Sequence, residues 1–170
     1  MSHGRALSLI VVNYNGGGGL PDRLRAFLDA AKGLDAEVVM VDNASTDGSA
    51  ELVCERLPVV RVVRSPKNRG YAAGVNIGLE VAAGEVFVVM NADVTPREGA
   101  FERLVEAVLA EDAPALVGGL VADRRGEPSP NCFRRAPRPS DILREALFLR
   151  PRTVRRRSLA GGTVPSEVVS

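Results

Sequence analysis

Apolar and polar positions along the first 122 residues follow two patterns, one typical of buried strands and the other of amphipathic helices. Short β-branched runs predict strands at Leu7–Asn13, Glu37–Val41, Val59–Val63, Glu85–Met90 and Ala115–Ala122. Between them, apolar side chains return every three or four positions and predict helices at Leu20–Lys32, Ser49–Leu57 and Gly70–Ala83. Strands alternating with helices predict an α/β fold, a mostly parallel sheet with helices on both faces.

A fourth helix is expected a few residues after Asp93. Thr95, Pro96 and Glu98 read as a capping box with proline at the first helical position. The segment that follows carries apolar side chains at helical spacing as far as Leu109. The pattern therefore predicts that this helix begins directly after Thr95.

Polar residues follow each of the first four predicted strands. They are Asn13-Tyr14-Asn15, Asp42-Asn43, Asn68-Arg69-Gly70-Tyr71 and Asn91-Ala92-Asp93. In sheets of this kind, ligands bind beyond the carboxyl ends of the strands. A single polar end is explained by helix capping, which is the main role expected for Ser45, Thr46 and Asp47. Four polar ends at one edge favour a polar ligand instead.

Two groups of glycines stand near these strand ends. Gly16–Gly19 follows the first strand but lacks the spacing of a dinucleotide-binding loop, so a flexible connection and a ligand loop stay open as alternatives. Gly70, Gly74 and Gly78 share one helical stripe. Each costs about 1 kcal/mol of helix stability relative to alanine. For Gly74 and Gly78 we favour tight packing of helix on sheet over ligand contact.

Composition narrows the chemistry. The only histidine is His3, and the two cysteines, Cys54 and Cys132, form no Cys-x-x-Cys pair. Histidine-based acid–base catalysis, zinc–thiolate sites and a disulfide framework are therefore not expected. No apolar run is long enough for a transmembrane helix. Aromatic residues make up only 4% of the chain and no nucleic-acid-binding motif occurs, so a nucleic-acid partner is not expected.

Charge divides the chain near Asp123. Residues 1–122 hold 11 basic and 16 acidic side chains, whereas residues 123–170 hold 11 basic and 5 acidic ones. We interpret residues 1–122 as the ligand-binding α/β domain. Residues 123–170 are interpreted as an incomplete further segment or a basic linker. This segment carries a group of arginines, Arg150, Arg152, Arg155, Arg156 and Arg157. They would attract an anionic membrane surface, although a solvated linker explains them as well.

Taken together, the strand-end motifs resemble those of the family 2 glycosyltransferases of the GT-A fold, a Rossmann-like α/β architecture. Within that family the similarity is to the rhamnosyltransferase-like branch. It rests on four segments, Val11–Asn15, Val41–Ser49, Asn68–Asn76 and Met90–Asp93. The resemblance covers residues 7–122 well and continues more loosely through Arg134–Pro139. It implies transfer of a sugar, dTDP-rhamnose being one candidate donor, to an acceptor hydroxyl in the synthesis of cell-surface polysaccharide or glycolipid.

The resemblance also implies roles for individual residues. Asn13, Tyr14 and Asn15 would border the nucleotide, and Asp42 would accept hydrogen bonds from its base or ribose. The remaining donor-binding residues would be Asn43, Asn68, Arg69, Gly70, Asn76 and Asn91. Asn91-Ala92-Asp93 stands where the family carries an Asp-x-Asp metal motif, so Asp93 alone would hold Mg²⁺ or Mn²⁺ together with the donor diphosphate. The ion would assist departure of the diphosphate.

One expected part of the family pattern is absent from this chain. Inverting members use a carboxylate as general base, in a motif well after the metal site, and none of the carboxylates after Asp93 stands in such a motif. The catalytic residue is therefore unassigned, and we interpret the chain as the donor-binding half of a longer enzyme. The resemblance also implies a polyprenyl-linked or polysaccharide acceptor. It further implies a cytoplasmic location, peripheral at the inner face of the membrane. The alternatives are a non-catalytic nucleotide-sugar-binding module and a sugar-nucleotidyltransferase.

Overall fold

Four parallel strands form the central sheet, in the order β3-β2-β1-β4. The computed structural model describes residues 7–112, 114–123, 127, 129 and 167–169. The strands are β1 (Leu7–Asn13), β2 (Ala36–Asp42), β3 (Arg61–Arg64) and β4 (Val86–Asn91). The register sets Asn13 directly beside Asp42 at the carboxyl ends of β1 and β2. The predicted parallel α/β fold is confirmed, with strand boundaries shifted by at most two residues.

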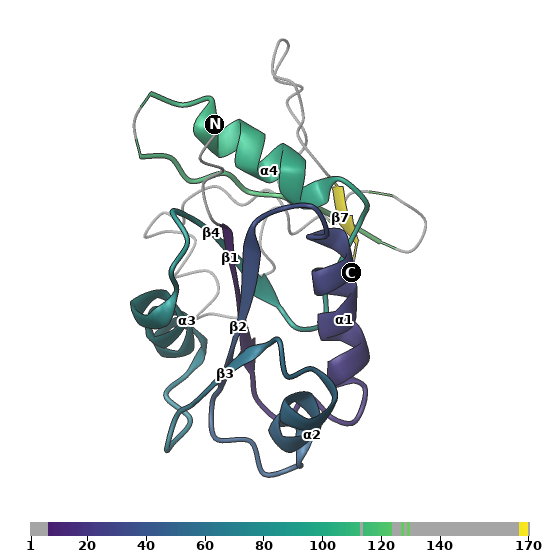
Figure 1. Ribbon diagram of the computed structural model, residues 1–170, viewed down its shortest axis with the longest axis vertical. Coiled ribbons are helices and arrows are strands. Elements are labelled where there is room, and N and C mark those ends of the chain that lie inside the picture. The colour runs from purple at the N-terminus through teal and green to yellow at the C-terminus, as the bar shows by residue number, and fades with distance from the viewer. Residues whose placement is uncertain (1–6, 113, 124–126, 128, 130–166, 170) are drawn as a thin grey trace, which may run out of the picture.

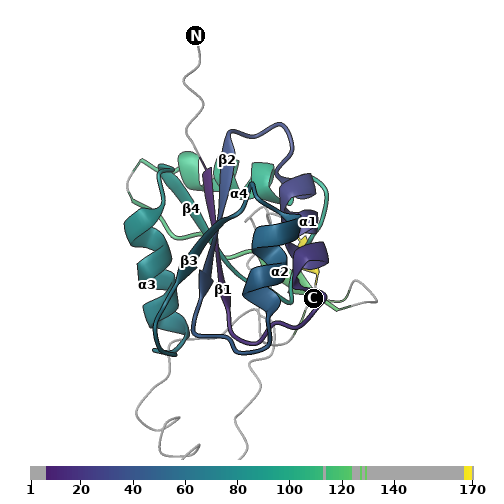
Figure 2. The ribbon, with the colours of Figure 1, turned by 60° about the horizontal axis from the view of Figure 1, so that its bottom comes forward.

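Helices cover both faces of this sheet, as the two ribbon views show (Figures 1 and 2). Helices α1 (Leu20–Ala30) and α2 (Ser49–Arg56) lie on one face, and α3 (Tyr71–Val81) lies on the other. The main core forms between the sheet and the first two helices. Its fully buried side chains include Leu9, Val11, Met40, Leu24, Phe27 and Val53.

Helix α3 lies unusually close to the sheet. A Cβ atom added at Gly74 would sit 2.7 Å from Val12 Cγ1, and one at Gly78 would sit 2.5 Å from Ile10 Cγ2. Contacts this short would force the neighbouring side chain or the helix to move, so glycine at both positions allows the close approach. The packing interpretation of these two glycines is therefore confirmed. By contrast, Gly70 has nothing near its missing Cβ and instead adopts a positive φ of 83° at the start of the helix.

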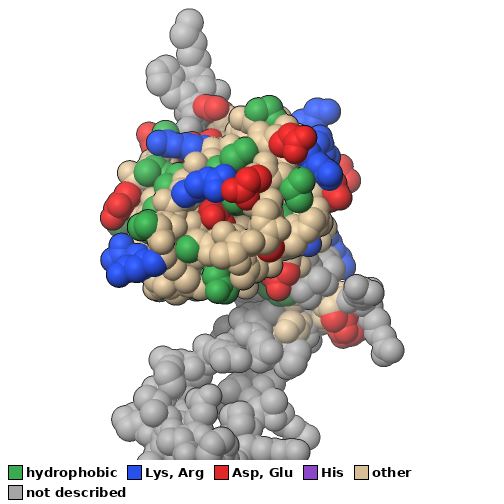
Figure 3. Space-filling view, turned by 90° about the horizontal axis from the view of Figure 1, so that it is seen from below, with side chains coloured by type: hydrophobic (Ala, Val, Ile, Leu, Met, Phe, Trp, Pro, Cys, Tyr) green, Lys and Arg blue, Asp and Glu red, His purple; other side chains and the backbone are tan. Residues whose placement is uncertain are grey.

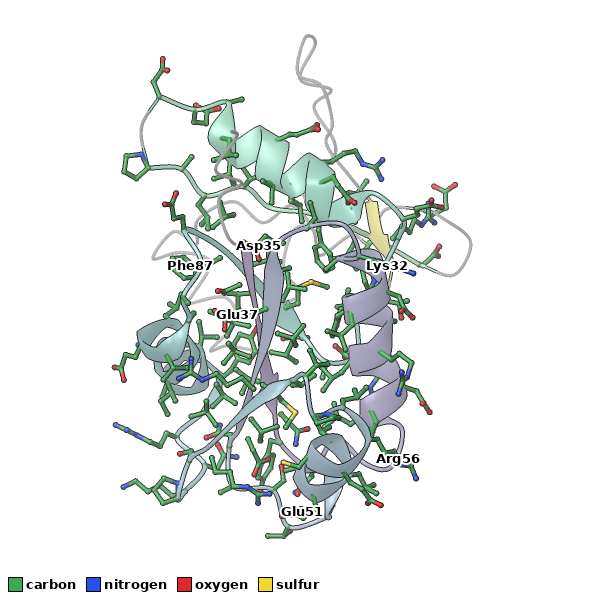
Figure 4. All side chains as sticks on the ribbon, viewed as in Figure 1. Lys32, Asp35, Glu37, Glu51, Arg56 and Phe87 are labelled. Carbon is green, nitrogen blue, oxygen red and sulfur yellow. The ribbon has the colours of Figure 1, made fainter. Side chains whose placement is uncertain are left out.

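Hydrogen bonds between Ser8, Glu37 and Ala83 stabilise the end of the sheet where the strands begin. Glu37 lies there with Asp35, far from Glu51 at the carboxyl-terminal end (Figure 4). The Ser8 hydroxyl donates to Glu37 Oε1 at 2.6 Å, and the backbone N–H of Ala83 donates to the same oxygen at 2.5 Å. The hydrogen bond from Ser8 is the main cause that holds the pKa of Glu37 below its ordinary value. These bonds fix the turn between α3 and β4.

A second, smaller sheet departs from the sequence-based expectation. It consists of β5 (Thr95–Pro96), β7 (Glu167–Val169) and β6 (Leu120–Ala122), in that order. The predicted fifth strand is thus shorter than expected and pairs with β7 instead of joining the main sheet. Helix α4 (Ala100–Leu109) begins after Gly99, whose φ is +71°. The predicted capping box is wrong because Thr95 pairs with Val169 in a strand and the helix starts only after the turn at Gly99.

Strand β4 forms an edge of the main sheet, and among the described residues it pairs only with β1. Phe87 and Val89 on this strand are 44% and 41% exposed. They line an apolar groove of about 740 Å³, together with Leu104 and Val108 of α4 and the fully exposed Leu116. Figure 4 shows Phe87 at the outer side of the sheet.

Within the part of the chain that the structure describes, no helix is long and apolar enough to cross a membrane. Arg134–Pro139 and the five arginines of residues 150–157 lie outside the described residues.

Candidate functional site

A cleft of about 420 Å³ opens at the carboxyl ends of the strands. Figure 3 looks onto this end of the molecule, where much of the described surface is uncharged and basic and acidic side chains lie interspersed. Residues from all four strand ends line the cleft: Val12, Asn13, Tyr14, Gly16, Arg23, Asn43, Asn68, Gly70, Tyr71, Asn91, Ala92 and Asp93. The predicted convergence of polar strand ends is therefore present in the structure.

Asn13 lies at the floor of the cleft and is 1% exposed. Its Nδ2 group lies 3.1 Å from Asp42 Oδ1 and 3.0 Å from the hydroxyl oxygens of Ser45 and Ser49. Its Oδ1 atom is buried and has no hydrogen-bond partner. A Cβ atom on Gly16 would lie 2.3 Å from that oxygen, so only glycine fits directly above the Asn13 side chain.

Asp42 is 3% exposed and is not part of the cleft lining. One carboxylate oxygen accepts the hydrogen bond from Asn13, and the other accepts none from the described residues. A carboxylate that is this deeply buried normally needs further partners. This second oxygen therefore has no protein donor among the described residues.

The loop after β1 is fastened to the loop after β2. Ser45 Oγ accepts from the backbone N–H of Asn15 at 2.9 Å, and Asn15 Oδ1 accepts from the N–H of Thr46 at 2.9 Å. Asp47 Oδ2 accepts from the N–H of Gly17 at 2.7 Å. Asp47 Oδ1 accepts from the backbone and hydroxyl of Ser49, and the hydroxyl bond is the main cause of its lowered pKa. The glycine loop is thereby held in one place.

Asn43 fastens the loop after β3 in the same way. Its side chain is 2% exposed and makes three hydrogen bonds to consecutive residues. Nδ2 donates to Asn68 Oδ1 at 2.9 Å and to the carbonyl of Gly70 at 3.1 Å, while Oδ1 accepts from the N–H of Arg69 at 3.0 Å. Both hydrogens of the amide group are used in these bonds. Asn43 therefore lines the cleft and also shapes the loop beside it.

Asp93 provides a carboxylate at the far wall of the cleft. It is exposed and lies next to Asn91 and Tyr71 in the lining. The pKa of Tyr71 is raised, mainly by burial of its side chain and also by the negative charge of Asp93. Carboxylate and amide oxygens are the ligands that hard divalent cations prefer, so Asp93 and Asn91 fit such an ion. Among the described residues no group of three acidic, histidine or cysteine side chains could hold a metal, so further ligands must come from a bound molecule and water.

The structure separates the predicted site residues into two groups. The predicted donor-binding residues that line the cleft are Asn13, Tyr14, Asn43, Asn68, Gly70 and Asn91, and the predicted metal residue Asp93 lines it with them. Those outside its lining are Asn15, Asp42, Arg69 and Asn76. Asn15 acts between the two loops, and Asn76 is exposed on α3.

Sequence reasoning missed Arg23, which lines the cleft from the first turn of α1. Its position four residues after the glycine run could have indicated that its side chain reaches back toward the loop. The guanidinium Nη2 donates to the carbonyl of Gly16.

Comparison with known proteins identifies the family of this chain. Residues 8–159 match the family described as Glycosyl transferase family 2. The chain is 33% identical over 105 residues to a dolichol-phosphate mannosyltransferase of Pyrococcus furiosus, covering 60% of this chain and 30% of that protein. It is 32% identical over 136 residues to an N-acetylglucosaminyl-diphospho-decaprenol L-rhamnosyltransferase of Mycobacterium tuberculosis, covering 74% and 44%. The chain thus spans less than half the length of these relatives.

Among solved structures, the fold is similar to that of a mannosyltransferase from Pyrobaculum calidifontis in complex with GDP-Man and Mn²⁺. The TM-score is 0.57 at 27% sequence identity, and the match covers 71% of this chain and 36% of that one. This similarity and the four-stranded parallel sheet identify the fold as GT-A. With most of its length matching the family, the chain belongs to glycosyl transferase family 2.

Proposed function

We propose that this chain carries the donor-binding part of a glycosyltransferase that moves a sugar from a nucleotide-diphosphate donor to an acceptor hydroxyl. The observation that supports this most is the cleft, where the glycine loop, the loop after β3 and Asn91-Ala92-Asp93 face one another. The two loops are held by hydrogen bonds before any ligand arrives, which lowers the entropic cost of binding. A nucleotide would lie along the carboxyl ends of β1 and β2, within reach of the free oxygen of Asp42.

Asp93 and Asn91 would hold Mg²⁺ or Mn²⁺ together with the diphosphate. The ion would neutralise the charge that develops on the departing nucleoside diphosphate. The solved relative that carries GDP-Man and Mn²⁺ supports a divalent ion in this family. Within the chain itself, Asn43 would keep Asn68 and Gly70 in position beside the sugar and diphosphate.

The acceptor class is proposed from the relatives. Two of them are named for polyprenyl-linked substrates, a dolichol phosphate and a decaprenol diphosphate. We therefore propose a polyprenyl-linked acceptor at a membrane surface, and dTDP-rhamnose among the first donors to test. Inversion at the sugar carbon would require a carboxylate base. Asp123 and Asp141 are the first candidates, and Asp141 lies outside the described residues.

The test measures donor binding first and transfer second. Thermal melting with UDP-glucose, GDP-mannose and dTDP-rhamnose, each with and without Mn²⁺, should show stabilisation by one nucleotide type that is larger with the metal. A donor that stabilises the chain is then assayed for transfer to polyprenyl-linked acceptors. Absence of stabilisation by every nucleotide sugar, with and without Mn²⁺, would contradict the proposed function.

A further inference from the structure

Arg23 is the only cationic side chain among the described residues that line the cleft. It is partly buried, yet no carboxylate pairs with it within the described part of the chain. Even its neighbour Asp22, which is exposed in the first turn of α1, makes no ion pair with it. A partly buried cation that lacks a counter-ion is costly, because it loses water without gaining an opposite charge.

The surroundings of Arg23 add to this cost. It lies in the first turn of α1, where the helix dipole disfavours a positive charge. Its Nε–H group is buried without a hydrogen-bond partner. One terminal nitrogen donates to the carbonyl of Gly16, which fixes the side chain against the glycine loop. An anion in the cleft would offset both the missing charge partner and the unfavourable dipole.

We propose that Arg23 binds the phosphate groups of the ligand that occupies the cleft. The inference rests on the proposed function, in which that ligand is a nucleotide-diphosphate sugar. The planar guanidinium presents several N–H groups in a fork that suits phosphate oxygens. Because Nη2 donates to Gly16 and Nε is buried, Nη1 is the nitrogen left to contact the diphosphate, which then lies between Arg23 and the carboxylate of Asp93 in the cleft.

The first experiment compares ligands with and without phosphates. Calorimetry measures the affinity of UDP, GDP and dTDP, and of the matching nucleosides, for wild type, Arg23→Gln and Arg23→Lys. Loss of a hydrogen bond to a charged group predicts roughly a tenfold to hundredfold weaker diphosphate affinity in Arg23→Gln. Nucleoside affinity should not change, and Arg23→Lys should be intermediate, because it keeps the charge without the fork.

Arg25→Gln is the matched control. Arg25 lies two residues further along α1, is exposed, and does not line the cleft. The substitution removes the same charge from the same helix and should leave diphosphate affinity unchanged. Equal weakening of nucleosides and diphosphates in Arg23→Gln would show that Arg23 only supports the loop at Gly16, and would overturn the proposal. Unchanged diphosphate affinity in that variant would overturn it as well.

A second arm separates this inference from the proposed function. Inorganic pyrophosphate alone should raise the melting temperature of wild type and of Arg25→Gln but not of Arg23→Gln. If that holds while no nucleotide binds, the anion site stands and the proposed function fails. If nucleotides bind wild type and Arg23→Gln equally, the anion site fails and the proposed function stands. Should Arg23→Gln not fold, the NMR signal of the Arg23 Nε–H group in wild type decides. A shift on adding pyrophosphate supports the proposal and an unmoved signal overturns it.

Discussion

Asn43 offers the sharpest test of how the cleft is built. Replacing it with alanine removes all three hydrogen bonds that hold Asn68, Arg69 and Gly70. The net worth of such a bond is about 0.5–1.5 kcal/mol. The three released partners belong to exposed residues, so water replaces the lost bonds and no buried group is orphaned. The expected cost is therefore in the lower part of the range, about 2 kcal/mol in total.

That cost should appear as local opening of the loop after β3, because the buried core of β1 and β2 is untouched. Amide hydrogen exchange reads it directly: the N–H of Arg69, which donates to Asn43 Oδ1, should exchange about 30-fold faster in Asn43→Ala. Under the proposed function, affinity for a nucleoside diphosphate should fall by a similar or smaller factor, because the binding-competent loop becomes a minor population.

The control variant removes a different bond from the same loop. Ser65→Ala deletes the 2.7 Å hydrogen bond from the Ser65 hydroxyl to the carbonyl of Lys67 and leaves the Asn43 contacts in place. Exchange at Arg69 should then match wild type. If Asn43→Ala leaves exchange at Arg69 unchanged, or if both variants accelerate it equally, Asn43 does not hold the loop and the reasoning is refuted.

Three further predictions test other parts of the fold and site. Gly78→Ala should destabilise the chain by about 1 kcal/mol, because forcing a methyl group against Ile10 costs more than the helix propensity gained. Chemical unfolding should show that this penalty disappears when Ile10→Ala is also present. Strictly additive effects of the two substitutions would speak against the contact. Glu37 has a lowered pKa, so its contribution to the free energy of unfolding is complete above its ordinary pKa of 4.5 and is lost as the pH falls below that value. Glu37→Gln should therefore make the free energy of unfolding depend less on pH in the acid range. An unchanged pH dependence would show that the hydrogen bonds of Glu37 do not stabilise the fold. Asp93→Asn should abolish the enhancement of nucleoside-diphosphate binding by Mn²⁺, measured by calorimetry with and without the ion; undiminished enhancement would remove Asp93 from the metal site.

The sequence pattern was sufficient for the main sheet because β1, β2 and β4 are largely apolar runs that end in polar residues, and the valine pair Val62-Val63 marks β3. The convergence of Asn13, Asn43, Asn68 and Asp93 followed from topology alone, since parallel strands bring their carboxyl ends to one edge. Periodicity also indicated the glycine stripe of α3. The distance of closest approach, 2.5 Å at Gly78, depends on the tertiary packing and could not be read from spacing.

Other features depend on contacts between distant segments. Asp42 stands at a strand end, and its side chain contacts the amide of Asn13 and lies outside the cleft lining. Arg23 belongs to the cleft only because its side chain folds back to Gly16. Thr95 fits a helix cap locally, but pairing with a strand more than 70 residues later prevails. Local patterns carry no information about these partners.

Within the described part of the chain, the outer edge of β4 is unpaired, and this has a consequence for handling the protein in solution. The strand reads Val-Phe-Val-Val-Met-Asn and contains no charge, proline or glycine, which are the devices that keep edge strands from pairing with other chains. At the concentrations used for crystallography or NMR spectroscopy, copies of the chain should therefore associate edge to edge, and slow aggregation would compete with every ligand titration. A lysine in place of Val89, which is 41% exposed and does not line the cleft at the carboxyl ends of the strands, supplies the missing gatekeeper charge.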